Sequence, residues 1–411
     1  MSNDRFELPL SINNQKFYYN PDRIDRRKEM LEKFIEGMYY MNSPKFAHKV
    51  LFTHELQANN TIEGYKDDVG TIYNAIFHNL NISDPRRRLR ILNLYKAYLY
   101  ILKGKPINRE TLKELYTILS EGLLDFYQNA NMGEYYRKDE VVIDLKGKLT
   151  LSETELQDAV DALRKGVGDY ETQYKDRYKD VFVGAEVAKI EEYMNELLNF
   201  MDDNTMFNTG AKTDAFVKSQ ILHFFFVYIH PYFDLNGRTA RTVSMWYLLR
   251  NKAYPFIIFN RAINLNQKKY YESIRDVRVY HNMTAFLVYM MDNTLIELEK
   301  EHLMELISYH SHGDLTSLDY QNLHYILSMK GQKTYIDFCN YYNRYNERRS
   351  MSEIFDRMLT PLLDKGVIIE GGATGKKKEF SNFSDGRNHT FSLNEDFFDP
   401  GDPKIQHLVL K

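Results

Sequence analysis

The sequence predicts a mainly α-helical protein that carries a small β-hairpin and ends in a module of mixed helices and strands. Apolar residues recur every three or four positions over long stretches, which is the period of one face of a helix. Hydrophobic residues make up 43% of the 411 residues and only 10 are proline, as expected of a folded helical chain. Because this length exceeds that of one typical domain, we expect two or three domains.

The composition excludes several classes of protein. A net charge of −3 argues against binding of a polyanion along the whole chain. The single cysteine, Cys339, excludes a disulfide scaffold and a Cys-rich zinc site, and it favours a reducing compartment. The N-terminus lacks an apolar signal segment, and no apolar run reaches the roughly 18 residues of a membrane span. We therefore expect a cytoplasmic, bacterial protein with no membrane partner.

Helices are expected over much of the first 300 residues, separated by proline and glycine. The predicted helices cover residues 25–41, 46–60, 68–80, 85–102, 185–200, 214–229, 238–250, 267–277 and 283–303. Between them, the β-branched stretch Val141, Val142 and Ile143 precedes Gly147 and predicts a short hairpin with a glycine turn. The polar residues 165–180 predict a surface insertion.

The last hundred residues have a different pattern. Predicted helices at 318–328, 334–342 and 351–363 precede predicted strands at 366–369 and 389–393, and this order resembles a winged helix-turn-helix module. Lys376, Lys377 and Lys378 lie at the proposed wing, where they could contact a nucleic-acid backbone. However, residues 310–411 contain 13 Lys and Arg against 14 Asp and Glu, so docking of a protein or dimerisation is an equal alternative.

The residues that could perform chemistry are concentrated at 230–241, between two apolar helical stretches. Pro231 disfavours the helical conformation at His230, so the first helix should end there and present the imidazole in a loop. Asn236 is the expected N-cap of the next helix, and Gly237 lets backbone amides approach a ligand. The partial positive charge of that helix start favours an anion.

Charged side chains complete this stretch. Arg238 and Arg241 are three residues apart on one helix face, where both can bind phosphate oxygens. Asp234 suits Mg²⁺, which proteins usually hold with one or two carboxylates plus substrate phosphates. His230 is the natural general base for an alcohol that attacks phosphorus. Together these residues predict transfer of a phosphorus-containing group from a nucleotide to a hydroxyl.

The stretch 230–241 resembles the signature of the Fic family, His-Pro-Phe-x-Asp/Glu-Gly-Asn-Gly-Arg-x-x-Arg. It reads His-Pro-Tyr-Phe-Asp-Leu-Asn-Gly-Arg-Thr-Ala-Arg here and agrees at seven of the nine fixed positions. Tyr232 and Leu235 stand where the signature has Phe and Gly, and that glycine could permit an unusual backbone angle or a close approach of phosphate. The resemblance covers roughly residues 40–300 and implies a Fic-type helical domain with a hairpin flap.

The resemblance implies protein AMPylation, in which a Ser, Thr or Tyr hydroxyl of a protein attacks the α-phosphate of ATP and pyrophosphate leaves. It implies that His230 takes the hydroxyl proton and that Asp234 holds Mg²⁺. The residues that would bind ATP and its phosphates are Asn236, Gly237, Arg238, Arg241, Tyr270 and Tyr271.

Two further segments resemble parts of the family. Gly133 to Arg137 with Val141, Val142 and Ile143 look like the flap that holds the target by strand addition, the alternative being a plain structural hairpin. Residues 59–64 resemble the inhibitory motif Ser/Thr-x-x-x-Glu-Gly/Asn, with asparagine at the first position. In the family the motif glutamate, here Glu63, pairs with the second motif arginine, here Arg241, and so removes the cation that would hold a γ-phosphate. The alternative is an ordinary helix end capped by Gly64.

We therefore predict an N-terminal helical region at 1–120 with an inhibitory helix at about 45–64, a catalytic core at 121–305, a linker at 306–313 and a winged helix at 314–411. The expected partners are ATP, an unidentified target protein that could be the protein itself, and a second copy in a homodimer. Two alternatives stay open. One is removal of AMP from a modified target with Glu63 positioning water, and the other is a DNA-binding or scaffold protein whose core senses nucleotide.

Overall fold

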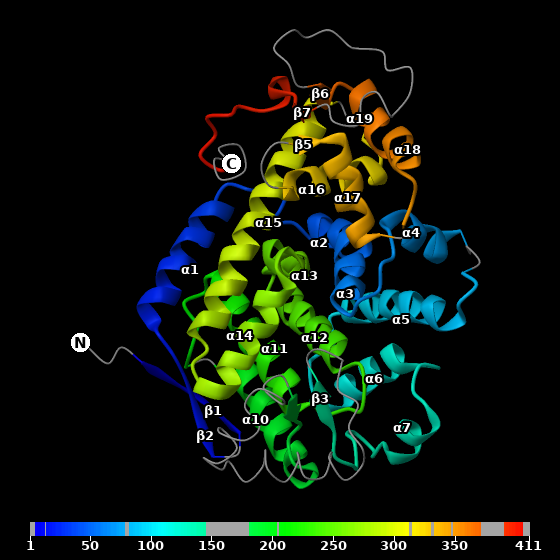
Figure 1. The fold of residues 1–411 in the computed structure, drawn as a ribbon. Coiled ribbons are helices and arrows are strands. Elements are labelled where there is room, and N and C mark those ends of the chain that lie inside the picture. The colour runs from blue at the N-terminus through cyan, green and yellow to red at the C-terminus, as the bar shows by residue number, and fades with distance from the viewer. Residues whose placement is uncertain are drawn as a thin grey trace, which may run out of the picture. The chain divides into compact units, whose positions relative to one another are not determined.

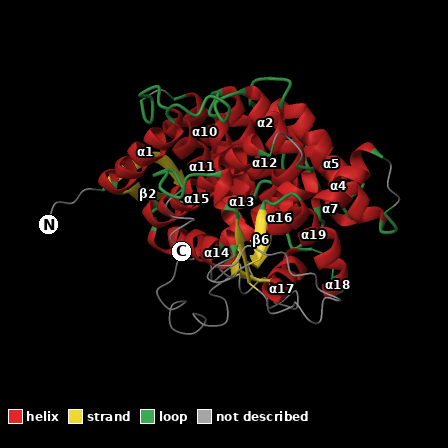
Figure 2. Cartoon of the chain, turned by 90° about the horizontal axis from the view of Figure 1, so that it is seen from above, coloured by secondary structure: helices red, strands yellow, loops and turns green. Residues whose placement is uncertain are grey.

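The computed structural model describes residues 5–12, 14–78, 82–144, 181–203, 205–311, 315–329, 333–346, 348–370 and 390–405. Helices dominate these residues and the strands are short (Figure 2), which confirms the mainly α-helical fold. The chain divides into two compact units that interleave along the sequence. Unit 1 comprises Met1–Lys33, Lys96–Ala253 and Asn266–Met291, and unit 2 comprises Phe34–Tyr95, Tyr254–Leu265 and Asp292–Lys411.

Unit 1 is built around two buried helices, α11 (Lys212–Ile229) and α12 (Asn236–Arg250), which pack against each other. The Ser244 hydroxyl donates to the Ser219 carbonyl at 3.0 Å between them, and the buried Trp246 packs edge-on against Tyr100. The remaining elements of unit 1 are β1 (Phe6–Ile12), β2 (Gln15–Tyr19), most of α1 (Pro21–Ile35), the end of α5 (Pro85–Ile101), α6 (Arg109–Ser120), α7 (Phe126–Asn131), β3 (Val142–Asp144), β4 (Val181–Val183), η2 (Val187–Lys189), α10 (Ile190–Asp202), α14 (Gln267–Tyr280) and the start of α15 (Thr284–His310).

Two hairpins belong to unit 1. β1 and β2 pair antiparallel, and the buried Leu8, Leu10 and Ile12 alternate along β1 with the period of a strand. This hairpin was not among the predicted elements. The alternation of apolar and polar residues along β1 is the signal that could have indicated it. In the second hairpin, β3 pairs antiparallel with β4, a partner that the sequence did not predict. Residues 145–180, including Gly147 and the expected insertion, lie outside the described residues.

In unit 2, α2 (Pro44–Val50), the π-helical turn η1 (Leu51–Glu55) and α3 (Leu56–Ile62) follow one another directly. The helix predicted at 46–60 therefore exists but contains one wider turn. The other elements of unit 2 are α4 (Val69–Phe77), the start of α5, η3 (Tyr254–Ile258), α13 (Phe259–Leu265), the later part of α15, α16 (Ser317–Ser328), β5 (Lys333–Thr334), α17 (Tyr335–Tyr345), α18 (Met351–Ile354), η4 (Phe355–Leu359), α19 (Thr360–Asp364), β6 (Ile368–Glu370), β7 (Thr390–Leu393) and η5 (Glu395–Phe397).

The C-terminal elements of unit 2, from α16 to β7, lie together in Figure 1. Their buried side chains form one hydrophobic core. The three strands form an antiparallel sheet in the order β5-β7-β6, which adds β5 to the predicted pair of strands. The Tyr335 ring of α17 stacks on Phe391 of β7, with ring centroids 5.5 Å apart. Lys376, Lys377 and Lys378 lie outside the described residues.

Helix α15 continues to His310, so residues 306–310 of the predicted linker are helical. Leu303, Met304 and Ile307 on this helix are buried in the C-terminal core. Their packing stabilises the last turns of the helix, although the residues from Ser308 onward are polar. The other predicted domain boundaries stay predictions. Among the described helices, none combines the length and apolar character that a membrane crossing requires.

Candidate active site

The loop between α11 and α12 holds the predicted motif. Helix α11 ends at Ile229, and His230 follows in the left-handed region with φ 54° and ψ 60°. This confirms that the helix stops before Pro231. The His230 amide still donates to the Phe226 carbonyl at 3.0 Å, so the end of the helix fixes the start of the loop.

The histidine has a defined tautomer. Its Nδ1 lies 3.2 Å from the Val227 carbonyl oxygen. Since a carbonyl can only accept a hydrogen bond, Nδ1 must carry the proton, which leaves the lone pair on Nε2. Burial lowers the pKa of His230 to about 3, although the hydrogen bond with Val227 has the opposite, smaller effect. The ring is therefore a neutral imidazole whose Nε2 can accept a proton.

Arg137 holds the backbone at this histidine, a role that the sequence did not predict. Its guanidinium is buried and donates to the carbonyls of His230 at 2.8 Å, Asp139 at 2.5 Å and Ala185 at 2.5 Å. Gly184 allows this arrangement, because a Cβ there would lie 2.6 Å from Arg137 Nη2 and 3.3 Å from the His230 Cβ. The motif loop and the backbone just after β4 are thus held by one buried cation.

A second buried guanidinium, that of Arg278 in α14, supports the same helix end. It donates to the carbonyls of Val227 at 3.2 Å and Tyr228 at 3.4 Å. Its charge lies over the Tyr228 ring at 4.2 Å and over the Phe182 ring of β4 at 4.6 Å. Burial lowers the pKa of Arg278 to about 10, so it remains a cation near neutral pH.

Asn236 closes the loop rather than capping α12. Its Oδ1 accepts from the Tyr232 amide at 3.0 Å and its Nδ2 donates to the Tyr232 carbonyl at 2.8 Å. The predicted N-cap at Asn236 is wrong, because Leu235 occupies that position and Asn236 is the first residue of the helix. The side chain is committed to the loop, so any contact of Asn236 with an anion would use its backbone amide, which lacks an acceptor within the helix.

Leu235 adopts a left-handed backbone conformation of the kind that glycine favours. Its φ is 65° and its ψ is 10°, and its side chain is buried. Its amide donates to Asp234 Oδ1 at 2.6 Å, and its carbonyl accepts from the Thr239 hydroxyl at 2.8 Å. The backbone bend therefore exists without the glycine, held by these bonds and by burial of the leucine.

We expect Leu235→Gly to be less destabilising than Leu235→Ala, although it removes one carbon more. Both variants lose the buried side chain, but glycine also relieves a left-handed strain of about 1 kcal/mol. The free energies of unfolding of the two variants, measured by chemical denaturation, test this order. A glycine variant less stable than the alanine variant would contradict it.

Tyr232 packs as an apolar ring. Its ring is fully buried and stacks on Tyr116 of α6, with centroids 3.6 Å apart and planes 8° apart. The Tyr232 hydroxyl has no hydrogen-bond partner among the described residues. Tyr232→Phe should therefore leave the protein as stable as the wild type or stabilise it by up to about 1 kcal/mol, measured as a change in the unfolding midpoint. A marked loss of stability would show that the hydroxyl is needed.

The charged residues of the motif differ in exposure. Arg238 and Arg241 are buried on α12, and burial together with the charge of Arg241 lowers the pKa of His223 to about 3. Gly237 is half-buried in the first turn, while Asp234 is exposed at the loop surface. Among the described residues, no three His, Cys, Asp or Glu side chains form a metal cluster. A single exposed carboxylate fits Mg²⁺ that takes its other ligands from water and phosphate.

The downstream tyrosines occupy different environments. Tyr270 is buried, and its hydroxyl lies 3.0 Å from His223 Nε2, while Tyr271 is half-buried. The predicted contact of these residues with a nucleotide base stays a prediction. In the predicted flap, Val142 and Ile143 belong to β3, and the Val141 carbonyl accepts from the Gly184 amide at 3.1 Å.

Glu63 lies at the C-cap of α3 in unit 2, followed by Gly64 with φ 85°. The Gly64 amide donates to the Thr61 carbonyl at 2.9 Å, so the glycine terminates the helix as expected. This local geometry suits both readings of the motif. The pairing of Glu63 with Arg241, which belongs to unit 1, stays a prediction.

The fold and the site define a helical protein with a loop that carries histidine, aspartate and arginine between two buried helices. Residues 106–248 match the model of the Fic/DOC family. Among solved structures, the chain is similar to a Fic family protein from Desulfovibrio desulfuricans G20, with 15% identity, a TM-score of 0.51, and coverage of 91% of this chain and 95% of that one. At this identity the likeness shows the fold alone, and the expected Fic-type helical fold is confirmed.

Proposed function

We propose that the protein transfers AMP from ATP to a protein hydroxyl. The observation that carries this proposal is the geometry of His230, whose Nδ1 faces a carbonyl and whose Nε2 is left as a proton acceptor directly before the helix that bears Arg238 and Arg241. The similarity of residues 106–248 to the Fic/DOC family supports the same chemistry.

In the proposed reaction, the hydroxyl oxygen of the target forms a bond to the α-phosphorus of ATP, and its proton passes to His230 Nε2. The bond between the α-phosphorus and the oxygen bridging to the β-phosphate breaks, and pyrophosphate leaves. The first amides of α12, at Asn236 and Gly237, stabilise the charge on the α-phosphate. Arg238 and Arg241 orient the β- and γ-phosphates.

Asp234 would hold Mg²⁺, which when bound neutralises part of the phosphate charge. The exposed position of this carboxylate beside the loop suits that function. Arg137 and Arg278 act as positioning residues, since both hold the backbone around His230 and neither is proposed to contact substrate.

The flap would hold the target segment. Within the described part of the chain, β3 and β4 form a two-stranded sheet, so an extended segment could add to its edge and present its hydroxyl near His230. The unidentified target, which could be another copy of this protein in a homodimer, would then be chosen by the side chains around Val141, Val142 and Ile143.

The pKa of His230 predicts the pH dependence of the transfer. A general base acts when deprotonated, and a pKa lowered from 6.5 to about 3 keeps it deprotonated throughout mildly acidic solution. We therefore expect the rate per molecule of folded protein to change less than about twofold between pH 8 and pH 5.5. A rate that halves near pH 6.5, with the protein still folded by circular dichroism, would contradict this.

The proposed function is tested with ATP labelled at either the α- or the γ-phosphate. Label from the α-position should enter the protein and label from the γ-position should not, since pyrophosphate leaves. Competition by GTP, CTP and UTP then tests the choice of nucleotide. Incorporation of label from the γ-position would indicate phosphate transfer and would contradict the proposal.

We also propose that the C-terminal elements form a winged-helix module that contacts protein rather than DNA. The order of α16, β5, α17, α18, β6 and β7, and their three-stranded sheet, support the module. Its nearly balanced charge supports a protein partner. Gel-shift titrations over a range of salt concentrations test this, because phosphate-driven DNA binding would appear at low salt and weaken steeply as salt rises.

A further inference from the structure

Unit 2 contains a cavity of about 50 Å³ whose walls come from η1, α3, α13, α16 and α17. This volume holds a few water-sized groups, so it suits a molecule of about four to six heavy atoms. The cavity belongs to unit 2 alone, whereas the motif loop belongs to unit 1.

Two polar groups that line the cavity need partners. Arg261 is buried, and its Nε lies 3.2 Å from Glu55 while its Nη1 contacts Glu301, but its Nη2 has no hydrogen-bond acceptor among the described residues. Gln321 is fully buried and donates from Nε2 to the Tyr325 hydroxyl at 2.9 Å. No donor in the described part of the chain reaches its Oε1. A buried polar group without a partner is destabilising, and a ligand with an acceptor beside a donor could satisfy both groups.

The charged groups around the cavity largely neutralise one another. The carboxyl groups of Glu55, Glu297 and Glu301 face the cations of Arg261 and Lys300. Burial raises the pKa of Glu55 to about 8, so this set carries a net charge of zero or −1. An anion would therefore find no net attraction, and a cation would meet the guanidinium of Arg261.

The histidines of the cavity wall do not change this balance. Burial lowers the pKa of both His54 and His324, and the His324 ring lies 2.7 Å from Glu297. The two imidazole rings lie 6.0 Å apart at an angle of 22°. They therefore present neutral, flat surfaces that suit a small planar molecule.

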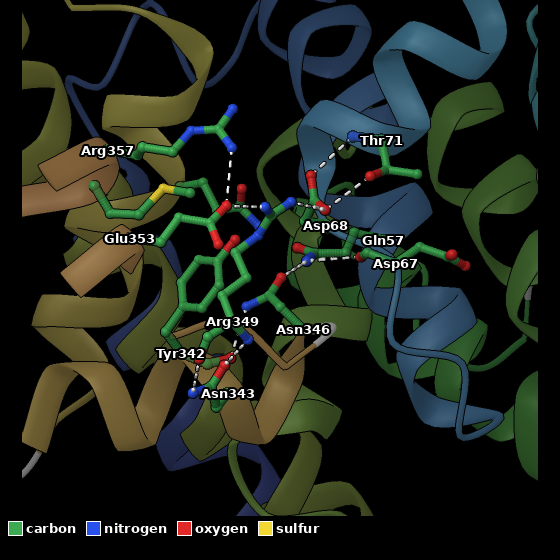
Figure 3. A network of polar contacts seen from close by, with 12 residues as sticks. Gln57, Asp67, Asp68, Thr71, Tyr342, Asn343, Asn346, Arg349, Glu353 and Arg357 are labelled. Atoms are coloured by element: carbon green, nitrogen blue, oxygen red, sulfur yellow. Dashed lines mark hydrogen bonds and ion pairs between the residues drawn. The ribbon is translucent and has the colours of Figure 1, made fainter. Parts of the chain in front are cut away.

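One wall of the cavity is formed by α3, the helix whose C-cap is Glu63. Gln57 of α3 lines the cavity and donates to the Tyr325 hydroxyl at 3.0 Å and to the Asp67 carbonyl at 3.1 Å. Tyr325 in turn donates to Asn346 Oδ1 at 3.2 Å. Figure 3 shows Gln57 between Asp67 and Asn346, with Arg349 and Glu353 beyond them. The cavity wall thus joins α3 to the C-terminal helices.

We propose that this cavity is an effector site for a small, planar, uncharged molecule with an amide-like edge, and that its occupancy holds α3, and with it Glu63, in place. The regulatory half of this proposal rests on the proposed inhibitory function of Glu63. The ligand class does not, because it follows from Arg261, Gln321 and the charge around them.

Three planar probes of four heavy atoms test the ligand class: acetamide, acetate and acetamidinium. Saturation-transfer NMR on the full chain should detect acetamide and neither ion. The acetamide signal should be lost with Gln321→Met, which removes the amide, and with Ala58→Val, which narrows the cavity, but kept with Tyr309→Phe on the exposed face of α15. Preferential binding of acetate, binding unaffected by both cavity variants, or a cavity that holds ordered water only would overturn the site.

Self-labelling with ATP tests the regulation. Saturating acetamide should lower wild-type labelling by at least about twofold and leave Glu63→Gly labelling unchanged. Binding without any change in wild-type labelling would refute the regulatory half. A Glu63→Gly protein that binds acetamide but labels itself under no condition would instead refute the proposed function and leave the ligand site standing.

Discussion

His230→Asn should lower the rate of AMP transfer by about 10²–10⁴-fold while ATP binding persists. Asparagine tolerates the left-handed backbone of this position, so the loop should keep its shape and lose only the proton acceptor. The rate is measured as incorporation of α-labelled ATP, and binding by equilibrium dialysis.

His281 provides a matched control. It also follows the end of a helix in the left-handed region, with φ 52°, and its ring packs against Phe17 rather than at the motif loop. His281→Asn should therefore leave the transfer rate within about twofold of the wild type. Equal losses in both variants would mean that the substitution acts through the helix end and not through general-base catalysis.

Glu63→Gly should raise self-labelling by about 10²-fold. The proposed reason is that Arg241, no longer paired with a carboxylate, can hold the γ-phosphate and so align the α-phosphate for attack. The gain should disappear when Arg241→Ala is added, since the released cation is then absent. Initial rates with labelled ATP and Mg²⁺ measure both effects.

The chain offers a control with the same pair of residues at a helix end. Glu121 lies at the C-cap of α6 and is followed by Gly122 with φ 69°, as Glu63 is followed by Gly64. If Glu63 were only a helix end, Glu63→Gly and Glu121→Gly would affect labelling equally. If Glu63 is inhibitory, the Glu121→Gly variant should label itself at the same rate as the wild type.

The parts of the site that the sequence predicts are local in the chain. Pro231 marks the end of α11, and the residue types from His230 to Arg241 are adjacent, so their spacing alone brings them to one loop. Asn236 shows the limit of such reasoning. An asparagine close to the start of a helix is usually its N-cap. Here the Asn236 side chain instead forms two hydrogen bonds with the Tyr232 backbone.

The parts that the sequence does not predict depend on contacts between distant residues. Arg137 reaches a carbonyl 93 residues away, and Arg278 reaches one 51 residues away. No periodicity or capping rule links such positions, and an arginine on a helix or in a loop is usually a solvated surface residue. The strand partner of β3 was missed for the same reason, since residues 145–180 separate the two strands.

Leu235 lies between these cases. It stands where the signature has glycine, and its backbone has the left-handed angle that glycine most easily adopts. The reason is partly tertiary, because burial of the leucine side chain offsets the backbone strain. Two local hydrogen bonds, to Asp234 and from Thr239, also hold the bend.

The central claim is that the triphosphate of ATP binds at the start of α12 with its α-phosphorus facing His230. A crystal structure with Mg²⁺ and α,β-methylene-ATP, which cannot be cleaved at the α–β position, tests this most directly. The account predicts the β- and γ-phosphates against Arg238 and Arg241, and Nε2 of His230 directed at the space beside the α-phosphate. A nucleotide bound elsewhere, or an imidazole rotated so that Nε2 faces the protein interior, would contradict it.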